Sequence, residues 1–192
     1  MTDIRAMRDR LSNVRWIGGP PDAGKSTVTR LLAEWFDVPI YRHDGRELAH
    51  FRKATPETHP YTAATWHLIN EQGEDAFIQS WVDTEPEALA RDARANWSER
   101  VDFYCEDLLE IDTRGPVVAE GPGFFPDVIS PLLTTAEQAI WLIPRESFKR
   151  QAHEARGKSS RGRRTSDPDR FREHHIARDL ILADQYRREV EA

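Results

Sequence analysis

Apolar residues follow two patterns along this chain, and together they predict alternating strands and helices. Compact apolar runs over residues 14–17, 39–43, 116–120 and 138–143 have the length of short strands, and most end at glycine or proline. A helix is predicted from Gly24 onward, because apolar residues then recur at helical spacing: Val28, Leu31, Leu32, Trp35 and Phe36. This alternation indicates an α/β fold with a mostly parallel sheet of four or five strands.

The stretch from residue 44 to residue 112 is predicted to be helical throughout. Large apolar residues recur there at helix-like intervals, and three prolines divide the stretch into several helices: Pro56, Pro60 and Pro86. Further helices are predicted over residues 145–155 and 168–190. The segment 156–169 between them is polar, basic and contains Gly and Ser, so it is predicted to be a loop.

The composition is that of a soluble chain with a single domain. Its 192 residues suffice for one core, and 39% hydrophobic with 31% charged residues lies outside the disordered class. The net charge of −6 gives no support for nucleic-acid binding, so no nucleic-acid partner is expected. A single cysteine, Cys105, excludes an internal disulfide, and we interpret it as a core residue of a cytoplasmic protein. Neither a signal peptide nor a membrane span of roughly 18 apolar residues is indicated.

The strongest chemical signal is a glycine-rich loop between the first predicted strand and the first predicted helix. Residues 19–26 fit the phosphate-binding pattern G-x-x-x-x-G-K-[ST] at each fixed position. Its glycines let backbone N–H groups converge on an anion, and the helix start adds partial positive charge. Lys25 is expected to contact the outer phosphates, and Ser26 to bind Mg²⁺. The predicted ATP-binding residues are Gly19, Asp22, Ala23, Gly24, Lys25, Ser26 and Thr27.

Two carboxylates follow predicted strands, at the sheet edge where open α/β folds bind ligands. Asp44 would accept the proton of an acceptor hydroxyl, and Arg46 would clamp a polar or anionic group of the acceptor. Glu120 would orient Mg²⁺-bound water or bind the acceptor, together with Gly121. The alternative for both acids is a role as a helix or turn cap. His43, next to Asp44, is either part of the same site or a structural residue.

The basic segment over residues 156–168 has two interpretations. It is either a solvated run of charge or a lid that closes over the triphosphate. In a lid, arginines would stabilise charge on the transferring phosphoryl group. The best-placed candidates are Arg161, Arg163 and Arg164.

These motifs resemble those of the small P-loop kinases. That group includes nucleoside and nucleotide kinases, shikimate and gluconate kinases, and chloramphenicol phosphotransferase-like and zeta-toxin-like enzymes. The resemblance spans nearly the whole chain, and residues 19–27 carry its only specific motif. It implies a P-loop three-layer sandwich with a helical substrate cap over residues 44–112, which would bind the acceptor. It also implies that Asp44 is the base or a Mg²⁺ ligand, and that residues 156–168 are the lid. Members usually have a fifth strand whose following loop helps to hold adenine, and this sequence shows none.

The sequence therefore favours an ATP- and Mg²⁺-dependent kinase that phosphorylates a hydroxyl of a small molecule. Lys25, Asp44 and the lid arginines would be catalytic, while Ser26 and Glu120 would serve the metal. A nucleotide kinase with a phosphate acceptor is one alternative, since four arginines could bind that phosphate: Arg46, Arg52, Arg91 and Arg94. A nucleotide-dependent switch or interaction module is another. The identity of the acceptor and the oligomeric state stay open.

Overall fold

A four-stranded parallel sheet forms the centre of the computed structural model, which describes residues 4–111, 115–155 and 159–192. The strands are β1 (Val14–Gly18), β2 (Ile40–Arg42), β3 (Val117–Glu120) and β4 (Ala139–Trp141), in the order β2-β3-β1-β4. The four predicted strands are thus confirmed, and the described residues contain no fifth. β2 is shorter than predicted, because His43 already begins the 3₁₀ turn η1 (His43–Arg46).

The strand register brings the ends of three strands to one edge of the sheet. Glu120 lies opposite Ile17 of β1 and also opposite Arg42 of β2. Consequently the loop after β1, the turn after β2 and the end of β3 lie side by side. This is the edge at which open parallel sheets bind ligands.

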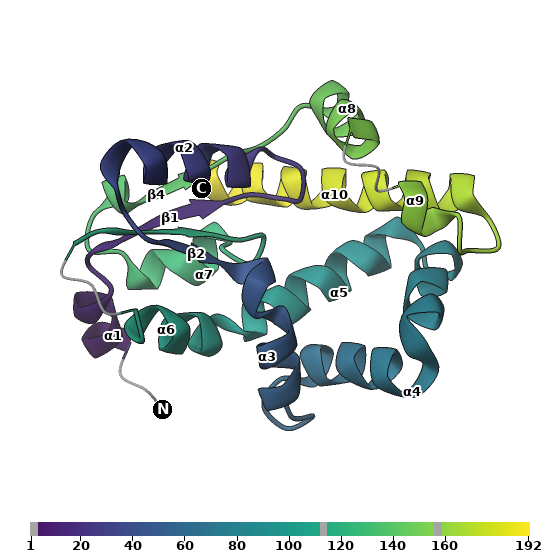
Figure 1. The fold of residues 1–192 in the computed structure, drawn as a ribbon, viewed down its shortest axis with the longest axis horizontal. Coiled ribbons are helices and arrows are strands. Elements are labelled where there is room, and N and C mark those ends of the chain that lie inside the picture. The colour runs from purple at the N-terminus through teal and green to yellow at the C-terminus, as the bar shows by residue number, and fades with distance from the viewer. Residues whose placement is uncertain (1–3, 112–114, 156–158) are drawn as a thin grey trace.

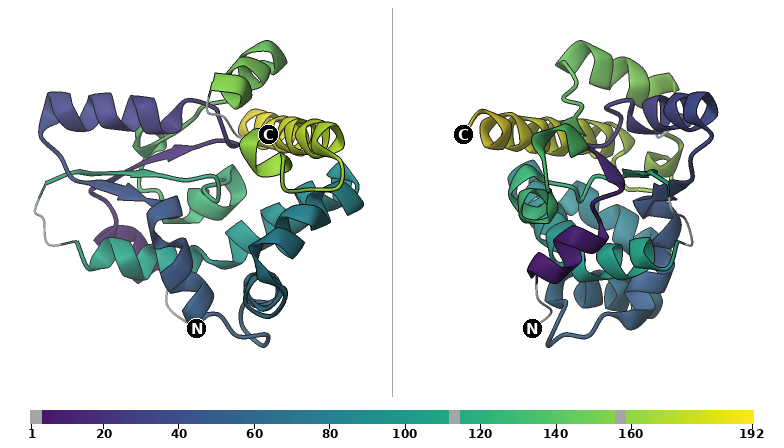
Figure 2. Two further views of the ribbon diagram at one scale, coloured as in Figure 1. Left: turned by 45° about the vertical axis from the view of Figure 1, so that its right-hand side comes forward. Right: turned by 90° about the vertical axis from the view of Figure 1, so that its left-hand side faces the viewer.

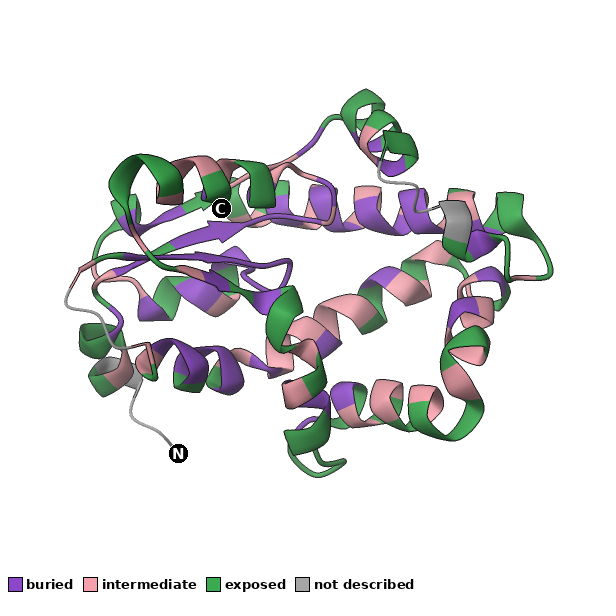
Figure 3. Cartoon of the chain, viewed as in Figure 1, coloured by how far each residue is buried: buried purple, intermediate pink, exposed green. Residues whose placement is uncertain are grey.

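Helices lie on both faces of the sheet, and β3 at its centre is buried throughout (Figure 3). α2 (Lys25–Phe36) covers one face. The other is covered by α1 (Ile4–Arg10), α6 (Val101–Leu109) and α7 (Pro126–Ile129), with the 3₁₀ turns η2 (Ser130–Leu132) and η3 (Ala136–Gln138) nearby. The core lies on this second side, where Trp16 and Phe124 meet edge to face with ring centroids 5.0 Å apart. Cys105 is buried there, as predicted, and burial raises the pKa of its thiol to about 12.

The described part of residues 44–112 is helical, as predicted. α3 (Glu47–Lys53), α4 (Pro60–Asp83) and α5 (Pro86–Glu99) extend to one side of the sheet and form a helical arch (Figures 1 and 2). α4 bends at Gly73, whose φ of 88° and ψ of 166° lie outside the helical range. That backbone conformation is essentially restricted to glycine, so the bend depends on this residue.

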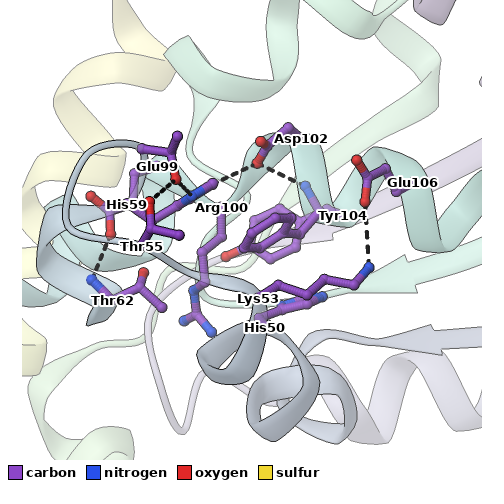
Figure 4. A network of polar contacts seen from close by, with 12 residues as sticks. His50, Lys53, Thr55, His59, Thr62, Glu99, Arg100, Asp102, Tyr104 and Glu106 are labelled. Carbon is purple, nitrogen blue, oxygen red and sulfur yellow. Dashed lines mark hydrogen bonds and ion pairs between the residues drawn. The ribbon is translucent and has the colours of Figure 1, made fainter. Parts of the chain in front are cut away.

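Polar contacts tie the beginning of α4 to the junction of α5 and α6 (Figure 4). His59 Nε2 lies 3.0 Å from Asp102 Oδ1, and the backbone N–H of Thr62 donates to Glu99 Oε1 over 2.5 Å. The Glu99 carboxylate thereby caps α4, which starts at a proline and whose N-cap residue, His59, makes no capping bond. Both contacts fix one end of the arch to the body of the protein.

Three further helices complete the chain: α8 (Glu146–Ala155), α9 (Ser159–Gly162) and α10 (Pro168–Glu191). α10 is a helix of 24 residues that packs on α5 and α4 (Figure 1). The expectation of an uninterrupted loop over 156–169 is wrong for its described part, because α9 is helical. Thr165 stabilises this turn, since both its backbone N–H and its hydroxyl donate to the carbonyl of Gly162. Residues 156–158 of the predicted lid lie outside the described residues.

Candidate functional site

The loop between β1 and α2 has the backbone conformation that its glycines allow. Gly19 has a φ of 133°, and a Cβ there would lie 2.2 Å from the carbonyl oxygen of Leu142. Gly24 has a φ of 91° and is the N-cap of α2. Asp22 also adopts a positive φ, 63°, which is uncommon for a residue with a side chain. The loop therefore turns sharply into the N-terminus of a twelve-residue helix.

Lys25 folds back over this loop. Its ammonium group is buried and donates to the carbonyl oxygens of Gly19 and Pro20, both over 2.8 Å. Burial lowers the pKa of Lys25 to about 8, and the nearby carboxylates of Glu120 and Asp44 oppose that shift. The cation thus lies among carbonyl dipoles and acids, and a bound anion would add a further favourable partner.

Asp22 belongs to a buried network of charged side chains that the sequence patterns did not predict. Lys149 of α8 donates to Asp22 Oδ2 over 2.6 Å and also to Asp179 of α10. Arg178 donates from Nε to Asp179 Oδ1 over 2.8 Å, and its guanidinium carbon lies 4.3 Å from the ring centroid of Trp81. The network connects the loop to α8, α10 and the helical arch. No local pattern predicted it, because its members come from the loop, α8 and α10.

Asp44 lies in η1, at the end of β2. Its carboxylate is 86% exposed and lies 3.1 Å from His43 Nδ1. The other ring nitrogen of His43 lies 2.8 Å from the hydroxyl of Tyr104, and this hydroxyl lies 2.7 Å from the carbonyl oxygen of Trp97. Burial lowers the pKa of His43 to about 4, so this imidazole is neutral near pH 7. Neither η1 nor α3 has a capping side chain, so the capping alternative for Asp44 is not observed.

Glu120 is the last residue of β3 and is only 7% exposed. Arg42 Nε lies 3.7 Å from Glu120 Oε1, beyond hydrogen-bond distance. Gly121 follows directly and packs against the His43 side chain, where a Cβ would lie 2.7 Å from the Cβ of His43. Gly121 therefore permits the close approach of two loops and does not itself line the cavity described next.

One cavity of about 1010 Å³ connects the loop with the helical arch. Eight of the predicted site residues line it: Asp22, Ala23, Gly24, Lys25, Ser26, Asp44, Glu120 and Arg161. The predicted residues that do not line it are Gly19, Thr27, Arg46, Gly121, Arg163 and Arg164. The fold thus places most of the loop, both carboxylates and one arginine of the basic segment around a common space.

The predicted arginines outside this cavity have other positions. Arg46 donates from Nε and from a terminal nitrogen to the carboxylate of buried Asp107, over 3.0 and 2.8 Å. Arg164 pairs with Glu74 and Asp75 on α4, while Arg163 is exposed. Arg46 therefore anchors α6 to η1, and Arg164 attaches the segment after α9 to the arch.

The tryptophans differ in their surroundings. Trp81 and Trp97 line the cavity, as does Arg178, which contacts both rings. Trp66 instead stacks on Phe51, and Trp35 is 73% exposed on α2. Two of these four tryptophans therefore face the cavity.

A second, shallower hollow of about 420 Å³ lies on the other side of the loop. It is formed by Ala23 and by the segment from Trp141 to Phe148, which leads from β4 into α8. In the part of the chain that the structure describes, no group of three His, Cys, Asp or Glu side chains forms a metal cluster. No described helix has the length and apolar character needed to cross a membrane.

Comparisons with protein-family models, with curated proteins and with solved structures found no match to this chain.

Proposed function

We infer that this protein is an ATP- and Mg²⁺-dependent phosphotransferase that phosphorylates a hydroxyl group of a small molecule. One observation carries the proposal: Lys25 and Ser26 line the same cavity as Asp44 and Glu120. The ammonium group of Lys25 and the hydroxyl of Ser26, in the first turn of α2, therefore line the same cavity as two carboxylates. Phosphoryl transfer depends on such positioning and charge stabilisation more than on covalent chemistry.

The triphosphate would bind at the Gly19–Thr27 loop. Pro20 and Pro21 have no N–H, so the donors would come from residues 22–27, reinforced by the N-terminus of α2. Lys25 would exchange its carbonyl partners for phosphate oxygens. The nucleobase would extend toward the second hollow, whose wall includes Pro144 and the half-exposed ring of Phe148.

Mg²⁺ fits the donors around this space. Ser26 and Glu120 offer hard oxygen atoms, and Mg²⁺ is commonly held by one or two such protein ligands together with phosphates and water. Bound Mg²⁺ would neutralise charge on the phosphates. Ser26 would bind it, and Glu120 would hold its water shell.

Asp44 would accept the hydroxyl proton from the acceptor. It lies at the end of β2, next to the loop, and its exposed carboxylate faces the cavity. His43 would orient this carboxylate, because its ring is fixed between Asp44 and Tyr104. Arg161 is the arginine of the predicted lid that would stabilise the transferring phosphoryl group, since Arg163 and Arg164 are directed elsewhere.

The nucleotide-kinase alternative has less support. It requires arginines that bind an acceptor phosphate, and none of the four candidates lines the cavity: Arg46, Arg52, Arg91 and Arg94. Arg94, for example, pairs with Asp127 and Glu189 over 2.6 and 2.9 Å. A nucleotide-dependent switch stays an alternative that the next experiment would detect.

Calorimetry with MgATP and an acceptor screen read by product mass test the proposal. The wild type and Lys53→Ala, which removes an exposed cation, should bind MgATP, whereas Lys25→Ala should bind it at least about tenfold more weakly. Asp44→Asn should lower turnover by about 10²-fold or more while leaving nucleotide affinity nearly unchanged. Undetectable nucleotide affinity in the wild type would exclude the function. Binding and slow hydrolysis without any phosphorylated product would favour the switch.

A further inference from the structure

The part of the cavity that faces the helical arch differs chemically from the part that faces the loop. Its wall comes from α4 and α5, and its apolar members include Leu68, Ile69, Phe77 and Leu89. All four are large apolar residues that line the cavity and stay only partly buried. An apolar surface of this kind inside a cavity gains free energy when a ligand removes it from water.

The charged residues that residues 44–97 contribute to the cavity are all acidic. Asp44, Glu47 and Asp92 line it, and this stretch, which the structure describes in full, adds no lysine or arginine to the lining. The basic residues of the lining come from other segments: Lys25, Arg161, His175 and Arg178. Arg178 packs on Trp81 and Trp97 of this wall, but its charge is paired with that of buried Asp179. An acceptor with its own negative charge would meet like charges at the arch, whereas a neutral or cationic one would not.

Several uncharged polar groups on the wall already have partners within the protein. Asn96 donates to the Thr65 hydroxyl over 3.2 Å, and the Ser80 hydroxyl donates to the Phe77 carbonyl over 2.7 Å. Tyr61 and Thr84 are the other uncharged residues with a hydroxyl in the lining from this stretch. A polyol such as a sugar would leave several hydroxyls without partners against this surface, and burying an unpaired hydroxyl costs free energy. The size of the space suits a drug-sized ligand, even after part of it is taken by the phosphate tail.

We propose that the acceptor is an apolar-bodied alcohol without negative charge: a ring-containing molecule of drug size, neutral or protonated at an amine. Its body packs against Leu68, Ile69 and Phe77, and its hydroxyl lies near Asp44. The acceptor oxygen forms a bond to the terminal phosphorus of ATP as the bond to the bridging oxygen breaks. ADP leaves with that electron pair, and the hydroxyl proton passes to Asp44. This assignment depends on the proposed phosphotransferase function and narrows it to one class of substrate.

The experiment compares three matched alcohols: biphenylmethanol, its aminomethyl derivative and its carboxylate derivative. A hexose, a sugar acid and a nucleoside monophosphate complete the panel. Phosphorylation is read by product mass, and binding by tryptophan fluorescence, because Trp81 and Trp97 line the cavity. The neutral and amine-bearing alcohols should bind and react with a kcat/KM at least about tenfold above that of the carboxylate, a difference typical of one unfavourable charge contact.

Two adjacent positions on α4 provide the matched variants. Leu68→Asp places a charge in the cavity wall, whereas His67→Asp places the same charge on the exposed side of the helix. Leu68→Asp should raise the KM for the ring alcohols at least about tenfold, with MgATP affinity unchanged. His67→Asp should leave both values unchanged. An unchanged KM in Leu68→Asp would show that the alcohols do not bind against this wall.

Other results would overturn the substrate class without affecting the phosphotransferase function. Preferred phosphorylation of the hexose, the sugar acid or the nucleotide is one. Failure of both ring alcohols to change tryptophan emission, at concentrations where MgATP binds, is another. Loss of MgATP binding in the wild type would instead contradict the function itself, so the two failures are distinguishable.

Discussion

The ammonium group of Lys149 lies 2.6 Å from a carboxylate oxygen of Asp22, and both side chains are completely buried. Asp22 is part of the loop between β1 and α2, whereas Lys149 belongs to α8. Asp179 of α10 is the second partner of the same ammonium group. One cation thus holds the loop, α8 and α10 together, and it supports the positive φ of Asp22.

Replacing Lys149 by methionine should destabilise the fold strongly. The variant would leave the carboxylates of Asp22 and Asp179 buried without their shared cation, and breaking a buried ion pair from one side costs about 3–5 kcal/mol. Urea unfolding of Lys149→Met would measure the loss. Lys53→Met is the control, because it removes an exposed lysine 3.4 Å from Glu106 and should cost less than about 1 kcal/mol. Similar losses in both variants would contradict the importance of the buried network.

Local patterns predicted the parts of the fold that depend on neighbouring residues. The apolar runs predicted all four strands, and helical spacing predicted α2, the arch and α10. The glycine pattern predicted the loop, because the backbone angles at Gly19 and Gly24 follow from the residue type. The short helix α1 was not predicted, since its seven residues carry no clear apolar period.

Partners distant in the sequence could not be predicted in this way. Arg46 was expected at the acceptor, but Asp107, 61 residues later, accepts two hydrogen bonds from it. Asp22 and Lys149 are 127 residues apart, and no local signal connects them. Which of several arginines faces the cavity also depends on the packing of α9 and α4, and this places Arg161 but not Arg164 at the cavity.

The bend in α4 should be sensitive to any side chain at position 73. Gly73→Ala would force an L residue to a φ of 88° and a ψ of 166°, at a cost of about 1–3 kcal/mol. Gly45→Ala serves as the control, because Gly45 does not have a positive φ and a Cβ there would meet no atom within 4 Å. Urea unfolding should show a loss only for Gly73→Ala. If both variants were equally stable, the bend would not depend on glycine.

Binding of ATP should weaken as the pH rises above 8. Burial lowers the pKa of Lys25 from 10.5 to about 8, so the ligand-free protein loses this cation as the pH rises through about 8. A triphosphate prefers the protonated form, and its binding should therefore take up a proton above about pH 8. Calorimetry at pH 7 and pH 9.5, in buffers of different ionisation enthalpy, measures affinity and proton uptake together. Lys25→Arg keeps its charge and should show a smaller decrease. Equal decreases would assign the titration to another group.

Acid should destabilise the fold in part through His43. Burial lowers its pKa from 6.5 to about 4, so between these values the unfolded chain binds a proton that the folded chain does not. Stability therefore decreases as the pH falls through this window, by about 3 kcal/mol in total, and this contribution stays constant below pH 4. His43→Gln removes the titrating ring and should show a smaller decrease in unfolding free energy between pH 6.5 and pH 4. His67→Gln, at an exposed position, should follow the wild type. A His43→Gln curve parallel to that of the wild type would show that this imidazole does not stay neutral in the fold.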